Sequence, residues 1–77
     1  MLIKLTAAAS GKALLVNVRD IHRVSEPQTP DNAQDQQRFA MSKSVIEYNR
    51  PHPTRPGQFA FDFVRETPDE IAAKMVV

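Results

Sequence analysis

Cysteine is absent from this chain of 77 residues. Its absence excludes disulfides, thiolate nucleophiles and cysteine-based zinc sites, and small secreted domains usually depend on the first of these. The first nine residues carry one lysine and too short an apolar run for a secretory signal peptide. No stretch approaches the roughly 18 uncharged apolar residues of a membrane span. We therefore expect a cytoplasmic protein that makes no contact with a membrane.

Glycine and histidine are scarce. The two glycines, Gly11 and Gly57, lie far apart, so a glycine-rich phosphate loop is excluded. Neither His22 nor His52 has a serine or carboxylate at a spacing typical of catalysis. Asp20 and His22 together offer only two metal ligands, which make a weak site. The sequence predicts a protein that is not an enzyme and has no cofactor and no metal.

An excess of charge is also lacking. Ten Lys plus Arg against nine Asp plus Glu give a net charge of +1, far from the basic excess of dedicated nucleic-acid binders. Charge is nevertheless uneven, because residues 26–35 hold three acids and no base, whereas residues 50–55 hold two arginines, a histidine and no acid. Nucleic acid is therefore a less favoured partner than protein.

The length allows a single domain, residues 1–77, with one small core. A chain of this size buries only about 60 to 65% of its unfolded surface, which leaves a small surplus of stability. We expect support from a partner or from a second copy in a homo-oligomer.

Short apolar runs predict strands in the first third of the chain. Residues 2–6 alternate, with Ile3 and Leu5 on one face, and the glycine at position 11 allows the chain to reverse. Residues 13–18 are apolar on both faces near their start, which favours a central strand. Residues 20–26 read as a third extended piece, with one helical turn over 18–22 as the alternative.

Two polar, proline-containing segments, residues 27–41 and 49–58, are expected to be exposed loops. Residues 44–48 and 58–65 alternate as strands and are expected to pair as a hairpin. Phe59, Phe61 and Phe63 follow strict period two, so we expect them at the centre of the core, buried under the C-terminal helix. The alternative is an open sheet on which these rings stack nucleic-acid bases.

A helix is predicted over residues 67–77. Thr67 can cap it, Pro68 suits its first position, and Glu70 completes a capping box. An apolar stripe at helical spacing follows: Ile71, Ala72, Met75 and Val76. The fold class is therefore α+β, a small, mostly antiparallel sheet of four or five short strands that can curl towards a barrel, covered by one amphipathic C-terminal helix.

Basic residues near the loops are the candidate partner-binding site. They are Arg50, His52, Arg55, Arg38 and Lys43. The prolines between residues 51 and 56 lower the entropy cost of ordering this loop on a partner. The alternative is a stiff, solvated hairpin tip.

The two ends of the chain resemble the FlbD/SwrD family of small flagellar-operon proteins. At the amino end the resemblance rests on Ile3 to Thr6, Gly11, Leu15 to Asn17, Asp20-Ile21 and Val24. At the carboxyl end it rests on Phe63 to Ile71 and on Lys74-Met75. The chain departs from the family in its long central segments, where the family has tight turns. The resemblance implies an accessory factor that acts through protein contacts, with no catalytic residues to transfer.

Three functional hypotheses follow. The first is a small non-enzymatic protein-interaction module, in a flagellar or phage-related setting, that binds a larger protein or assembly. The second is a small nucleic-acid-binding protein that uses the basic loop, with an affinity that falls steeply with salt. The third is an oligomeric small-molecule sequestering protein whose pocket forms between copies.

Overall fold

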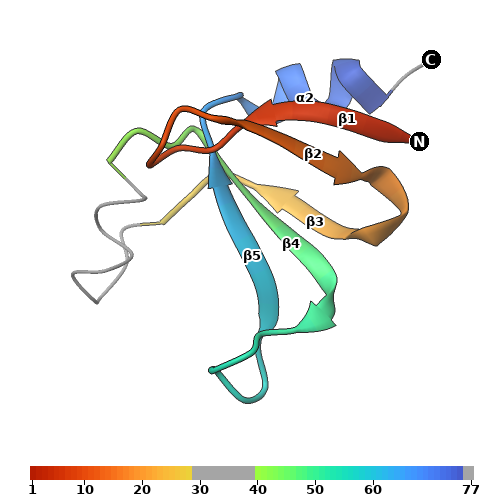
Figure 1. The fold of residues 1–77 in the computed structure, drawn as a ribbon, viewed down its shortest axis with the longest axis vertical. Coiled ribbons are helices and arrows are strands. Elements are labelled where there is room, and N and C mark those ends of the chain that lie inside the picture. The colour runs from red at the N-terminus through yellow and green to blue at the C-terminus, as the bar shows by residue number, and fades with distance from the viewer. Residues whose placement is uncertain (29–39, 76–77) are drawn as a thin grey trace.

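The computed structural model describes residues 1–28 and 40–75. Its elements are β1 (Leu2–Thr6), β2 (Ala13–Asn17), the 3₁₀ turn η1 (Val18–Asp20), β3 (Ile21–Ser25), β4 (Ser44–Pro51), β5 (Phe59–Val64) and α2 (Pro68–Met75). The strands form two antiparallel sheets, β1–β2 and β3–β4–β5 (Figure 1). This α+β arrangement confirms the predicted fold class, and the strands in the described residues do not close into a barrel.

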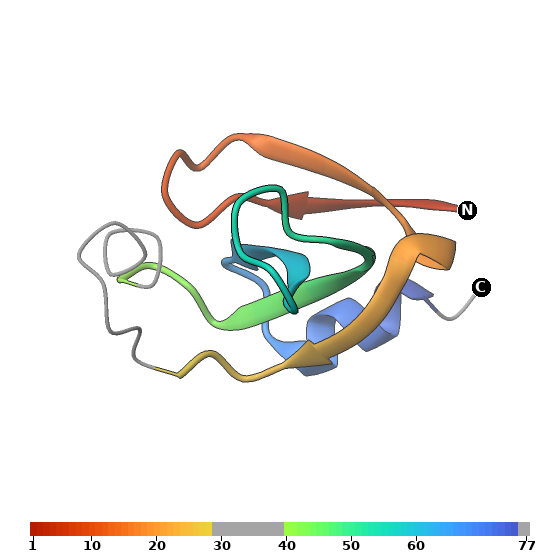
Figure 2. The same cartoon turned by 90° about the horizontal axis from the view of Figure 1, so that it is seen from below.

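The two sheets meet along one end of β5. The Ala8 N–H donates to the Phe63 carbonyl at 2.9 Å. The Arg65 N–H donates to the Thr6 carbonyl, also at 2.9 Å. In Figure 2, β5 accordingly lies between the β1–β2 hairpin and β4. The chain that follows β1 therefore occupies the outer edge of β5 at its C-terminal end.

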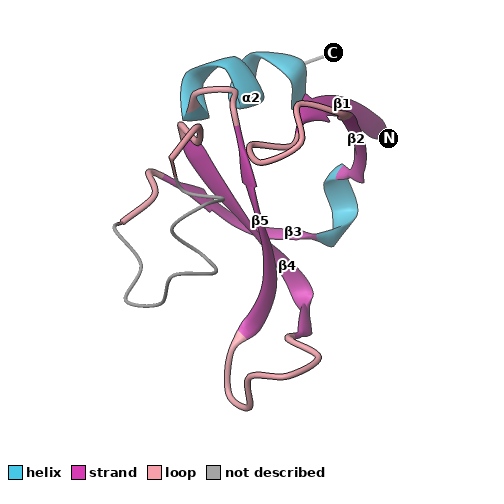
Figure 3. Ribbon diagram, turned by 60° about the vertical axis from the view of Figure 1, so that its left-hand side comes forward, coloured by secondary structure: helices cyan, strands magenta, loops and turns pink. Residues whose placement is uncertain are grey.

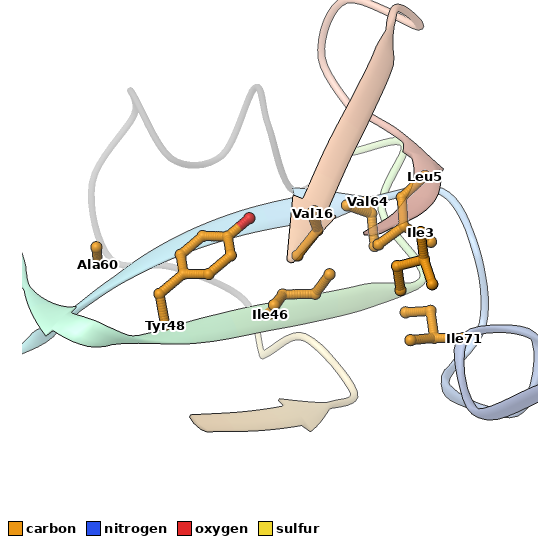
Figure 4. Close-up of a cluster of buried hydrophobic side chains, with 8 residues drawn as sticks. All are labelled: Ile3, Leu5, Val16, Ile46, Tyr48, Ala60, Val64 and Ile71. Carbon is orange, nitrogen blue, oxygen red and sulfur yellow. The ribbon is translucent and has the colours of Figure 1, made fainter. Parts of the chain in front are cut away.

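The core lies between the hairpin and the three-stranded sheet. As predicted, the alternation in β1 buries Ile3 and Leu5 and exposes Leu2 and Lys4. The buried apolar cluster draws on the hairpin, β4, β5 and α2, and it consists of Ile3, Leu5, Val16, Ile46, Tyr48, Ala60, Val64 and Ile71 (Figure 4). A single core therefore spans both sheets and the helix.

The prediction that the three phenylalanines of β5 form the centre of the core is wrong. Phe59 is 42% exposed, Phe61 is half-buried, and Phe63, though buried, is not part of the core cluster. The other face of β5, with Ala60 and Val64, packs into the core instead. The helix does not cover the phenylalanines, because its one buried side chain packs into that same core cluster on the opposite side of the sheet.

β2 is not the central strand that its apolar run predicts. Among the described residues it pairs only with β1, and Leu15 is 66% exposed. The strand ends at Asn17, whose side chain accepts a hydrogen bond from the Arg19 N–H and so starts the 3₁₀ turn. This turn agrees with the alternative prediction of one helical turn before the third strand.

The expected hairpin of β4 and β5 is confirmed. β4 extends through Pro51, so the exposed connection begins at His52 rather than at residue 49. A register shift between Glu47 and Pro51 accommodates the proline, which cannot donate to the ladder. Of the other predicted loop, 27–41, residues 29–39 lie outside the described residues.

The helix begins at Pro68 as predicted. The Glu70 N–H donates to the Thr67 hydroxyl at 3.1 Å, and the Thr67 N–H donates to the Glu70 carboxylate at 3.1 Å, which completes the capping box. Of the predicted apolar stripe, Ile71 is buried and Met75 half-buried, but Ala72 is exposed. Val76, at the predicted C-terminal end, lies outside the described residues.

Candidate functional site

The candidate site is the side of the β3–β4–β5 sheet that faces away from the core. We call this side the aromatic face, because it carries Phe59, Phe61 and Phe63 of β5, together with Val45 of β4. These side chains line an open groove of about 550 Å³. The strict alternation of β5 places the rings here, since its intervening residues face the core. The aromatic face is thus the reverse of a well-packed sheet.

Ring contacts hold the aromatic face in one arrangement. His22 stacks on Phe59 with ring centroids 4.4 Å apart, although β4 separates their strands. Phe61 meets Phe63 edge to face at 5.5 Å, and His52 lies 5.5 Å from Phe61. Pairs of this geometry add to the stability that burial alone provides. A partner would therefore meet rings that are already ordered, which lowers the entropy cost of binding.

Charges of both signs surround the rings. The Arg23 Nε donates to the Glu47 carboxylate at 2.8 Å, and the Arg55 guanidinium lies 5.4 Å from the Phe61 ring centroid. Glu26 lines the same groove. Two arginines and two glutamates leave no field of one sign. The rings thus lie within a polar border of mixed charge.

The structure separates the residues predicted to bind a partner. Arg55 and His52 lie against Phe61 on the aromatic face. The Arg50 guanidinium instead lies 4.5 Å from the ring centroid of Tyr48, a core residue. Lys43 precedes the opposite end of β4 and lines a separate hollow beside the start of α2.

Arg38, the fifth predicted residue, lies outside the described residues. The described basic residues therefore do not form one cationic patch.

Sequence reasoning missed the accessibility of Phe59 and Phe61 and the contributions of His22, Arg23 and Glu47. One signal was available. A helix of two to three turns with few large apolar side chains cannot cover three aromatic rings, so part of the Phe stripe had to remain outside the core. The stacking of His22 has no sequence signal, because it depends on the bulge that shifts the β3–β4 register between Ile21 and Arg23.

The described residues contain no cluster of metal-ligating side chains. Within residues 1–28 and 40–75, no group of three or more His, Asp or Glu side chains could hold a metal ion. Burial and the hydrogen bond to Asp62 raise the pKa of the hydroxyl of Tyr48, a core residue, above its ordinary value. No described helix has the length and apolar character needed to cross a bilayer.

Comparison of the chain with protein-family models, with curated proteins and with solved structures gives no match.

Proposed function

We propose that this chain is a small non-enzymatic protein-interaction module whose contact surface is the aromatic face. The observation that carries the proposal is the position of Phe59 and Phe61, which lie outside the core of a chain that has only five aromatic residues. A small domain has little stability to spare, so large apolar side chains left near water favour a role in binding. The resemblance of the chain ends to flagellar accessory proteins supports a flagellar or phage-related setting.

The surface has the features of an interaction hot spot. Rings of Phe59 and Phe61 supply apolar area near its centre, and Arg55 and the Arg23–Glu47 pair supply a polar border. Arg55, Gly57 and Gln58 of the connecting loop line the same groove. The predicted loop contact and the aromatic face thus form one surface, to which the loop contributes His52 and Arg55.

The test is affinity capture by the tagged chain from an extract of the cells that encode it. We would compare the wild type with Phe59→Ser and with the matched control Leu15→Ser, which removes an apolar side chain on the hairpin that is more exposed than Phe59. We expect one protein at stoichiometric yield with the wild type and the control, and its loss with Phe59→Ser. Capture that is equal for all three chains would contradict the proposal.

Nucleic-acid binding is the second candidate, because exposed rings on an antiparallel sheet can stack unpaired bases. The glutamates of the groove and the dispersal of Arg50, Arg55 and Lys43 make it less favoured. Nuclease treatment before capture separates the two candidates. Recovery of nucleic acid alone, with an affinity that falls steeply as salt rises, would replace the protein-binding proposal with this one.

A further inference from the structure

We propose that a second copy of this chain pairs with the free edge of β5, so that the aromatic faces of two copies join into one surface. The inference deepens the proposed function, on which it rests for the role of that face. The relevant feature is the set of backbone groups along β5 rather than its rings. Backbone N–H and C=O groups of alternate residues in a strand point to opposite edges.

Hydrogen bonds at both ends of β5 fix which residues point outward. The carbonyls of Gln58 and Val64 accept from His52 and Lys43, on the side of β4. The Phe63 carbonyl instead accepts from the Ala8 N–H, on the opposite edge. By alternation, the backbone groups of Phe59 and Phe61 point to the same edge as those of Phe63. No residue that the structure describes bonds to them there.

The free part of this edge is short and has defined limits. Beyond Phe61, residues Thr6 to Ala8 already occupy the edge. At the other end the chain turns at Gly57, which has a φ of +80° and lies two residues before β5 begins. Figure 3 shows this lower half of β5 running down to the proline-containing loop with β4 beside it. An added strand can therefore pair only along the segment from Gln58 to Asp62.

That segment is self-complementary. Its centre reads Phe59-Ala60-Phe61, which is the same in both directions. A two-fold axis through Ala60 would place each Phe59 opposite Phe61 of the second copy, with both N–H···O bonds exchanged between them. Ala60 would lie opposite its own copy at the closer, non-hydrogen-bonded spacing, where a small side chain fits. Gln58 would lie opposite Asp62, so that no like charges meet.

The centre of this segment offers little that would keep another strand away from its outer edge. Phe59-Ala60-Phe61 carries no charge and no proline, whereas β3 at the other edge of this sheet has Arg23 and a bulge. Pairing would satisfy the outward backbone groups and set Phe59 beside Phe61 across the new strand pair, which is a stabilising aromatic combination. The paired copies would present the rings of both chains on one continuous face.

The first experiment measures the oligomeric state by sedimentation over a concentration series. The variant is Phe59→Pro, at the first position of an edge strand where proline is tolerated. It removes an N–H that bonds to no other described residue of the same copy. The matched control is Phe59→Ser, which removes the ring and keeps the N–H. We expect a wild-type dimer, and a dimer constant for Phe59→Pro roughly thirtyfold weaker than for Phe59→Ser, since two hydrogen bonds are lost by symmetry.

The second experiment uses the absence of cysteine. Ala60→Cys would introduce a single thiol at the two-fold axis, where the Cα atoms of a non-hydrogen-bonded pair are close enough for a disulfide. We expect Ala60→Cys to form a covalent dimer on oxidation, and Leu15→Cys, on the exposed face of β2, to form little. Crosslinking by Leu15→Cys alone would assign the contact to the hairpin and overturn the proposal.

A wild type that stays monomeric at every concentration, or equal dimer constants for Phe59→Pro and Phe59→Ser, would also overturn it. These outcomes are distinguishable from failure of the proposed function. A monomer that still loses its captured protein on Phe59→Ser would leave the aromatic face as a binding site for that protein. If the wild type forms the dimer but Phe59→Ser captures the same proteins, the paired edge of β5 stands and the proposed binding role of the aromatic face fails.

Discussion

At the scale of single residues, the Tyr48 hydroxyl explains how a carboxylate is accommodated on the core side of β5. Tyr48 is buried, and its hydroxyl donates to the Asp62 carboxylate at 2.7 Å. Burial raises the pKa of Tyr48, and the hydrogen bond and the negative charge of Asp62 raise it further. The pair therefore stabilises the fold only while the tyrosine keeps its proton.

This shift predicts a loss of stability at high pH. Below pH 10.0, the ordinary pKa of tyrosine, both the folded and the unfolded chain hold the proton, and the contribution is fully present. Above that pH the unfolded chain releases the proton while the folded chain retains it, so unfolding becomes more favourable. We expect the free energy of unfolding to fall by up to about 1.4 kcal/mol per pH unit from this group. Denaturant unfolding at a series of alkaline pH values measures it.

The control for this prediction is Tyr48→Phe. It should cost about 1 to 3 kcal/mol near neutral pH, because Asp62 loses its hydrogen-bond donor on the core side. It should also flatten the alkaline slope, and subtraction of the two curves cancels the contribution of the lysines. Because Tyr48 is the only tyrosine and tryptophan is absent, the absorbance of tyrosinate reports its ionisation directly. Equal slopes for the two chains would show that Tyr48 is not the group responsible.

At the scale of single elements, the capping box fixes the start of α2. The helix has eight residues, too few to be stable alone, and its first turn is held by the reciprocal bonds of Thr67 and Glu70. We expect Thr67→Ala to lower the free energy of unfolding by about 1 kcal/mol. Thr54→Ala, in the exposed loop, should change it by less than about 0.5 kcal/mol. Thermal unfolding of both variants measures the difference, and equal effects would remove the cap as a source of stability.

The hydrogen bonds from Thr67 also lower the pKa of Glu70. The stabilisation by its carboxylate is therefore present above the ordinary pKa of 4.5 and is lost as the pH falls through the lower folded value. Glu70→Gln should weaken the cap at neutral pH and reduce the acid dependence of helix content. Circular dichroism over an acid titration measures this, and an unchanged acid dependence in the variant would contradict the assignment.

The two faces of the three-stranded sheet should respond differently to truncation. Ile46 is fully buried in the core, so Ile46→Ala is expected to cost about 2 to 5 kcal/mol. Phe59 is 42% exposed, so Phe59→Ala should cost much less than the 3 to 5 kcal/mol typical of a buried phenylalanine. Chemical denaturation gives both values. A larger cost at Phe59 than at Ile46 would mean that the aromatic face carries the core.

The sequence predicts these elements well but not the face that β5 buries. Thr67, Pro68 and Glu70 specify the helix start through local hydrogen bonds, and local signals are readable without tertiary structure. In β5 both faces alternate with period two, so periodicity cannot choose between them. The larger side chains on the face with Phe59, Phe61 and Phe63 predict that this face is buried. The face that is buried carries Ala60 and Val64, whose small size suits close contact with the hairpin across the core.

The candidate site was predictable only in part, for a related reason. The loop residues His52 and Arg55 are recognisable from composition, and the structure places both against Phe61. Arg50 belongs to the same charged run, yet it precedes the turn and lies over Tyr48 on the other side of the sheet. Strand alternation places Arg50 on the side of Tyr48, whereas His52 and Arg55 follow the end of β4 and are positioned by the loop.

At the scale of the whole molecule, stability depends on the seam that joins the hairpin to the three-stranded sheet. Thr6, at the end of β1, donates hydrogen bonds to the carboxylate of Glu66. Glu66 follows β5 and lies sixty residues later in the chain. One Glu66 oxygen accepts from the Thr6 N–H and the other from the Thr6 hydroxyl, each at 2.8 Å. Nearby, the Arg65 side chain donates through Nε and Nη2 to the Ala8 carbonyl, each at 3.1 Å. These contacts bring together the two ends of the chain.

Removal of the Glu66 carboxylate should therefore destabilise the whole domain rather than one element. We expect Glu66→Ala to lower the free energy of unfolding by about 2 to 3 kcal/mol, because two charge-assisted hydrogen bonds are lost and the Thr6 N–H is left without an acceptor. Thr6→Val removes only the hydroxyl donor and should cost about 1 kcal/mol. Because the two residues are in direct contact, the double variant should cost less than the sum of the single costs. Additive costs, or a hairpin that melts separately in the wild type, would show that the seam does not couple the two sheets.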